Sequence, residues 1–110
     1  MDNKYNINFD EAIKYGRNYV EILKERVNTL HYDHFILRDI QESMLRHLEN
    51  GDYQNYFIEL LYFNIYVLVK NKVIETRTTE VLDNYLDNLV EEKEQMLKTV
   101  EDYIDFYLKV

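Results

Sequence analysis

Three histidines are the residues of this sequence with the clearest capacity for chemistry. His31 and His34 are three residues apart, so on a helix they would share a face, with Asp33 or His47 as further metal ligands. The segment HYDH, however, has the composition of a corner between helices, and the chain has no Cys and no Glu-x-x-His pair. We therefore expect no metal site and no cofactor.

Arg26 and His31 have the spacing of the Arg-x4-His motif found in helical ribonuclease domains of the HEPN type. In that motif Arg stabilises phosphate and His transfers a proton. Here Val27, an apolar residue, follows the Arg where the motif has a polar one. The chain also lacks a Gly-rich phosphate loop, a Ser-His-Asp set and a dinucleotide-binding fingerprint. We therefore predict a protein that is not an enzyme.

The composition predicts one all-helical domain over residues 1–110. The chain is 46% hydrophobic and 31% charged, as globular proteins are. Two Gly and no Pro leave few of the residues that β-turns require. The absence of Cys, and an N-terminus without the basic and apolar regions of a secretory signal, predict a cytoplasmic location.

The first two helices follow from the spacing of apolar residues and from turn residues. Apolar side chains recur every three or four positions over 8–31, where Asn8 provides an N-cap and Glu11 a capping box. The second helix begins after Asp33 as its cap and ends at Asn50-Gly51. Its inward residues are expected to be Ile36 or Leu37, Ile40, Met44 and Leu48.

The stretch from Leu60 to Val69 has no charged residue and is too short to span a bilayer, which requires about 20 apolar residues. As a helix over residues 53–70, capped by Asp52, it would be apolar around its whole circumference and hence enclosed by other helices. As strands, 67–70 and 73–77 would pair in a hairpin, but the turn between them lacks Gly. We predict the enclosed helix.

A last helix is predicted from a cap at Thr78 or Thr79 to the end of the chain. Its apolar residues keep the helical period, and only Lys93 interrupts them. The segment would be about 45 Å long and would outreach the preceding helix. The predicted fold is therefore an antiparallel four-helix bundle with a long C-terminal helix, which also offers a homodimer interface.

The charge of the chain favours a protein partner over nucleic acid. The formal net charge is −8, and residues 79–110 contain nine acidic and three basic side chains. Such a surface repels phosphates and attracts basic proteins. The acids follow the helix period on the side opposite the apolar residues, about 5–6 Å apart, so they could imitate a nucleic-acid backbone or simply be solvated. The candidate partner-binding residues are Glu80, Asp83, Asp87, Glu91, Glu94, Glu101, Asp105, Tyr103 and Tyr107.

The segment LLYFNIYVLVKNKVIETRTTEVLDNYLDNL, Leu60–Leu89, resembles the third and fourth helices of the pediocin-like bacteriocin immunity proteins. The likeness lies in Tyr62-Phe63, in the Asn71-Lys72-Val73 turn and in the Thr-rich cap before Glu80. The resemblance implies a small cytosolic four-helix bundle that protects its producer by recognising a bacteriocin bound to its receptor. It also implies that the C-terminal part, about Leu97–Val110, determines specificity.

Taken together, these features predict a non-enzymatic, protein-binding helical bundle that neutralises or sequesters its target. The more specific version of this hypothesis is a bacteriocin immunity protein. The alternative is an acidic inhibitor from a phage or mobile element, of the anti-defence or anti-CRISPR kind, that imitates nucleic acid toward a host protein. Neither hypothesis involves direct binding to nucleic acid or insertion into a membrane.

Overall fold

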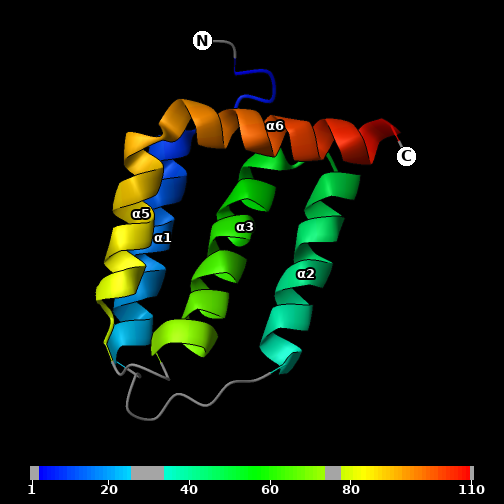
Figure 1. Ribbon diagram of the computed structural model, residues 1–110. Helices are drawn as coiled ribbons and strands as arrows, with labels where there is room; N and C mark the ends of the chain where they lie inside the picture. The colour runs from blue at the N-terminus through cyan, green and yellow to red at the C-terminus, as the bar shows by residue number, and fades with distance from the viewer. Residues whose placement is uncertain (1–2, 26–33, 74–77, 110) are drawn as a thin grey trace.

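The computed structural model describes residues 3–25, 34–73 and 78–109 (Figure 1). The regular structure in these ranges consists of α1 (Phe9–Glu25), α2 (His34–Glu49), α3 (Tyr53–Leu68), the π-helical turn η1 (Val69–Val73), α5 (Glu80–Glu91) and α6 (Lys93–Lys109). No strand occurs within them. The prediction of an all-α fold is confirmed.

Four of the helices run alongside one another, and the fifth lies across one end of them. Figure 1 shows α5 in front of α1 at the left, α3 in the middle and α2 at the right, with α6 crossing the top. α3 contacts α1, α2 and α5. The Cα atoms extend 41 × 30 × 18 Å, so the molecule is thin in one direction. The antiparallel four-helix bundle is not confirmed, because a separate fifth helix closes one end.

α3 contains most of the uncharged stretch of the sequence, and α1, α2 and α5 pack against it. Its buried residues occur around most of its circumference: Tyr56, Phe57, Ile58, Leu60, Leu61, Ile65 and Tyr66. The helix continues into η1, where Val69 is 1% exposed. Residues 67–73 are thus helical, and the hairpin alternative is wrong for this segment; residues 74–77 lie outside the described ranges.

The ends of the early helices follow the predicted turn chemistry. The Asn8 side chain accepts a hydrogen bond from the Glu11 N–H, 3.0 Å, as an N-cap does. Gly51 has φ +72°, the left-handed conformation that ends α2. The Asp52 carboxylate then accepts from the Asn55 N–H, 3.3 Å, and caps α3. Residues 26–33, which include the predicted Asp33 cap, lie outside the described ranges.

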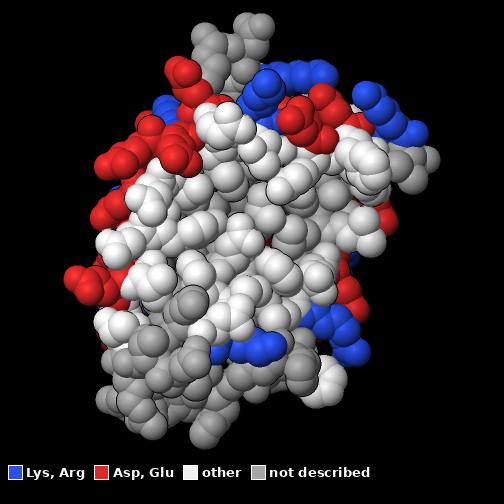
Figure 2. All heavy atoms as spheres, viewed as in Figure 1, with Lys and Arg blue, Asp and Glu red and all other residues white. Residues whose placement is uncertain are grey.

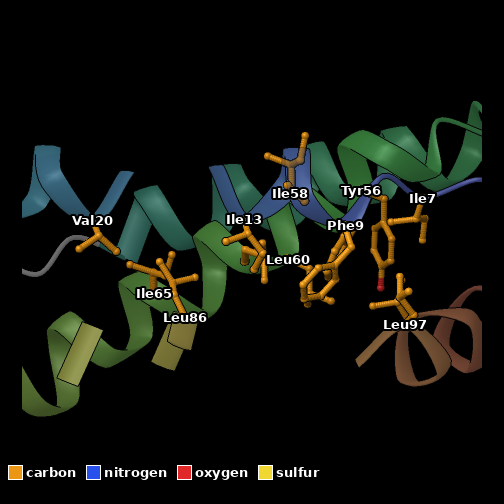
Figure 3. Close-up of a cluster of buried hydrophobic side chains, with 14 of the residues drawn as sticks. Ile7, Phe9, Ile13, Val20, Tyr56, Ile58, Leu60, Ile65, Leu86 and Leu97 are labelled. Atoms are coloured by element: carbon orange, nitrogen blue, oxygen red, sulfur yellow. The ribbon is translucent and has the colours of Figure 1, made fainter. Parts of the chain in front are cut away.

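The core is built along α3. Figure 3 shows Val20 of α1, Ile65 of α3 and Leu86 of α5 meeting near one end of the molecule. Gly16 allows α1 to approach closely, since a Cβ there would lie 3.3 Å from Leu86 Cδ2. The predicted inward residues of α2 are only half-buried, since α2 lies at the edge of the molecule.

The predicted continuous helix from residue 79 to the C-terminus is wrong. The helix that begins at Glu80, α5, ends at Glu91. Glu92 has φ −107° and ψ 33°, and a second helix, α6, begins at Lys93 in a new direction. The break also changes the buried side of α6. Leu97, Val100 and Ile104 are buried, whereas Tyr103, one of the predicted partner-binding residues, is 51% exposed.

The physical reason for the break is the length of the segment. A straight helix would carry its second half beyond the end of α3 and leave its apolar residues in water. The bend instead places Leu97 against Ile7, Phe9 and Tyr56, which would otherwise form an open end of the core (Figure 3). Burial of these side chains outweighs the cost of the non-helical backbone conformation at Glu92.

We expect Gly16→Val to lower the free energy of unfolding by about 1–3 kcal/mol, because the added carbons overfill the contact with Leu86 and Leu61. Urea denaturation followed by circular dichroism measures the change. Lys14→Val is the matched control, since Lys14 is exposed on the same helix and should change stability by no more than about 0.5 kcal/mol. Equal effects of the two substitutions would contradict the close packing at Gly16.

Candidate functional site

Two of the four acidic residues of α5 form ion pairs within the molecule. Asp83 Oδ2 lies 2.7 Å from Lys24 Nζ of α1, and Asp87 Oδ1 lies 3.1 Å from an Arg17 guanidinium nitrogen. Both pairs connect α5 to α1. Asp83 and Asp87, two of the four acids of α5 that were predicted to bind a partner, are therefore paired with α1. Either residue could bind a partner only if its ion pair with α1 were broken.

The acidic residues of α6 contact the N-terminal segment. Asp105 Oδ1 lies 2.9 Å from Lys4 Nζ and also accepts a hydrogen bond from the Tyr5 hydroxyl. Glu101 accepts from the Lys4 backbone N–H, 3.0 Å. The Tyr5 hydroxyl, followed by the Lys4 ammonium group, lowers the pKa of Asp105 below its ordinary value of 3.8. These contacts hold α6 on the body of the molecule.

The predicted acidic ridge is therefore not one continuous surface. The bend at Glu92 directs the acids of α5 and of α6 along different axes (Figure 1). Glu80, Glu91 and Glu94 remain exposed, and Glu91 and Glu94 lie together on a shallow hollow at the corner between the two helices. The nine predicted residues thus lie on two helices that run in different directions, and Glu91 and Glu94 meet at the corner between these helices.

α3 has one side that no helix covers along its length. Glu59 is bonded to side chains of α2, Tyr62 contacts a tyrosine ring of α1, and Asn64 donates to a tyrosine of α5. Phe63 and Val67 are one turn apart on the remaining side, which points away from α1. Both are half-buried, so this side of α3 reaches the surface between α5 and α2.

The neighbouring helices present uncharged residues to the same surface. Because Asp83 and Asp87 are directed to α1, the other side of α5 carries Val81, Tyr85 and Asn88. Asn64 Nδ2 of α3 donates to the Tyr85 hydroxyl, 3.0 Å, across the two helices. The ion pairs to α1 thus remove negative charge from the side of α5 that borders α3.

α6 adds exposed aromatic rings at the upper edge. Tyr103 lies near Tyr56, whose pKa is raised by burial and by this neighbouring phenol. Tyr103 is 51% exposed and Phe106, one turn further, is 71% exposed. Tyr107 is half-buried beside them.

Figure 2 shows a broad surface without Lys, Arg, Asp or Glu over α3, between α5 and α2, with charged groups around its margin. We call this surface the neutral face, and it is formed by Phe63, Asn64 and Val67 of α3, Tyr85 of α5 and Tyr103 of α6. The prediction from sequence included only Tyr103 of these. The sequence feature that could have indicated this face is the apolar pair Phe63 and Val67. A helix that is apolar on every side and has few neighbouring helices must leave some apolar residues at the surface.

A polar cluster that the sequence did not predict connects α2 to α3. Ser43 Oγ donates to Glu59 Oε1, 2.7 Å, and His47 Nε2 lies 3.2 Å from the same oxygen. His47 Nδ1 is 3.5 Å from Asp52. The Ser43 hydroxyl donates to the carboxylate at 2.7 Å and has a longer contact, 3.5 Å, with His47 Nε2, so its short hydrogen bond is not to the imidazole that would activate a nucleophile. Two features of the sequence could have indicated this cluster. Ser43 and His47 are four residues apart on one helix, and Glu59 is the single charged residue within α3.

Most residues of the metal and ribonuclease alternatives lie outside the described ranges, so the structure does not test these alternatives. Across the described residues, no three His, Cys, Asp or Glu side chains are grouped to hold a metal ion. His31 and Arg26 lie outside the described ranges, and the side chain of His34 is not described. No helix in the described part of the chain has the length and apolar character required to cross a membrane.

Comparison of the chain with protein-family models, with curated proteins and with solved structures finds no match. The resemblance to bacteriocin immunity proteins therefore stays a prediction.

We expect Asp105→Asn to destabilise the protein at neutral pH but not in acid. A carboxylate whose pKa is lowered by folding adds stability above its ordinary pKa of 3.8, and this contribution is lost as the pH falls through the lower folded-state value. The gap in urea midpoint between wild type and Asp105→Asn should thus narrow as the pH falls below about 4. Asp102→Asn, an exposed neighbour, is the control and should show a small gap at every pH.

Proposed function

We propose that this protein is a non-enzymatic binding module that sequesters or neutralises another protein through the neutral face. The observation that carries the proposal is the uncharged surface over α3, which contains the exposed ring of Tyr103 and has both acidic and basic groups around its margin (Figure 2). The surface has the arrangement of a protein interface, in which an uncharged, aromatic centre is surrounded by a charged rim.

The chemistry of the face favours a protein over a small molecule or a nucleic acid. Tyr103 and Phe106 are large side chains exposed at 51% and 71%, and exposed aromatics are typical anchors of protein interfaces. Single exposed apolar residues are ordinary, but a connected uncharged surface on a chain with 31% charged residues is not. The net charge of −8 of the chain would attract a basic partner.

The immunity form of this proposal is supported by the resemblance over Leu60–Leu89, which includes Phe63 of the neutral face. It is also consistent with an exposed aromatic group within Leu97–Val110, the part that the resemblance makes responsible for specificity. Deleting this part would remove buried Leu97, Val100 and Ile104 as well, so single exposed residues are the appropriate targets for mutation.

Tyr103→Ala and Phe106→Ala should each weaken binding of the partner by roughly tenfold or more, since each removes an aromatic anchor. The immobilised chain is used to capture partners from its native host, and the affinity of the purified partner for each variant is then measured by calorimetry. Lys98→Ala is the control on α6, because Lys98 is an exposed residue that does not belong to the neutral face. In cells exposed to a bacteriocin, the same two variants should lose protection if the immunity form is right.

Unchanged affinity in Tyr103→Ala, with retained folding, would contradict the neutral face as the binding surface, because Tyr103 is its most exposed aromatic residue. A partner captured equally well by Phe63→Asp would lead to the same conclusion, because a buried charge at an interface centre is costly.

The acidic inhibitor that imitates nucleic acid has weaker support, because Asp83 and Asp87 are paired with α1 and the ridge is bent. The exposed acids Glu80, Glu91 and Glu94 still allow it. Under this alternative, changing these three to Lys should abolish binding, and added salt should weaken the wild-type complex strongly. Under the neutral-face proposal, the same triple variant should alter the rate of association more than the rate of dissociation.

A further inference from the structure

We propose that α6 exchanges between two copies of this chain, so that α5 and α6 become one continuous helix and each α6 packs on the other copy. The surface on which α6 packs in the monomer is then covered by the α6 of a second molecule. This inference does not depend on the proposed function, because it concerns the purified chain alone.

The break between α5 and α6 is not encoded by the residues that form it. Glu91, Glu92, Lys93 and Glu94 all favour helix, and no Gly or Pro occurs from residue 78 to 109. Only Glu92 leaves the helical conformation. Its N–H still donates to the Asn88 carbonyl, 3.0 Å, and its carbonyl accepts from the Met96 N–H, 2.9 Å.

The turn between α2 and α3 provides the contrast. There Gly51 adopts φ +72° and Asp52 caps the following helix, so local chemistry ends one helix and begins the next. At Glu92 no comparable signal exists. The apolar period that predicted one helix to the C-terminus also continues through the break, with Lys93 as the single exception.

Tertiary contacts therefore hold the bend. Leu97, Val100 and Ile104 are 3%, 0% and 0% exposed. Figure 3 shows Leu97 facing Ile7, Phe9 and Tyr56, which belong to segments far from it in the sequence. Because no covalent constraint links α6 to these residues, a second copy can supply them with the same geometry.

The polar contacts of α6 can be exchanged in the same way. Lys4 pairs with Asp105 and donates its backbone N–H to Glu101. At the corner, Lys93 Nζ lies 3.8 Å from Asp10 and 5.5 Å from the centre of the Phe9 ring. Exchange keeps the contacts of α6 and restores regular helical backbone at Glu92 in both chains.

The cost of exchange lies in the charges of the hinge. In a symmetric dimer the two straightened helices pass each other near residue 92, which brings together the Glu91, Glu92 and Glu94 side chains of both copies. Repulsion among these carboxylates opposes the dimer at low ionic strength and is screened by salt. We therefore expect the dimer to become more abundant as salt and protein concentration increase.

The experiment combines light scattering with a zero-length cross-link. A carbodiimide joins Lys4 to Asp105, whose charged atoms are 2.9 Å apart, by an amide bond. In a mixture of isotope-labelled and unlabelled chains, mass spectrometry distinguishes a cross-link within one chain from one between chains. The expected result is a dimer in high salt in which the Lys4–Asp105 cross-link joins different chains.

Two glycine variants test the hinge. Glu92→Gly penalises helix at residue 92 in both chains of the dimer but not in the monomer, so dimerisation should weaken roughly thirtyfold. Glu91→Gly removes the same charge from a residue that is helical in both states, so in high salt, where the repulsion at the hinge is screened, it should leave the dimerisation constant nearly unchanged. In both variants the monomer should retain the intrachain cross-link, which shows that α6 still packs.

A chain that stays monomeric at high protein and salt concentration would overturn the proposal. A dimer that contains only intrachain Lys4–Asp105 cross-links would overturn it too, because that dimer would form without exchange. Equal weakening by Glu92→Gly and Glu91→Gly would contradict the role of the hinge.

Discussion

The burial of α3 is the constraint on which the rest of this structure depends. A helix that is apolar around its circumference must be covered by its neighbours, and each neighbour brings one apolar side to it. α1 and α5 cover two sides and meet at Gly16, where the lack of a side chain permits close approach. α2 covers a third through the Ser43–Glu59 contact. The remaining side is left to the surface, and the neutral face results from it.

The same constraint explains α6. The end of the core at Ile7, Phe9 and Tyr56 would be open if the last segment continued in the direction of α5. A bend at one residue allows Leu97 to close it. The bend is therefore maintained from outside the hinge, by packing and by the Lys4–Asp105 ion pair. Because α6 closes the end of the core only through such contacts, a second copy of the chain could provide the same contacts to α6.

Charge and apolar surface have separate roles in this molecule. Asp83, Asp87 and Asp105 form ion pairs that hold helices together, so they are not simply a ridge for a partner. By directing negative charge toward α1 and the N-terminal segment, these pairs leave an uncharged surface over α3. A partner would meet this surface first as an aromatic and apolar area and only at its margin as an acidic one.

The sequence by itself determined the helical class, the enclosed position of residues 53–68, the Asn8 and Asp52 caps and the Gly51 turn. Each of these depends on residues close in sequence, through helical period, side-chain capping or the left-handed backbone of glycine. The tertiary structure alone decided the bend at Glu92, the intramolecular pairing of the acids and the uncovered side of α3. These features arise between residues distant in sequence, and a helical period states only that a side is apolar, not which neighbour covers it.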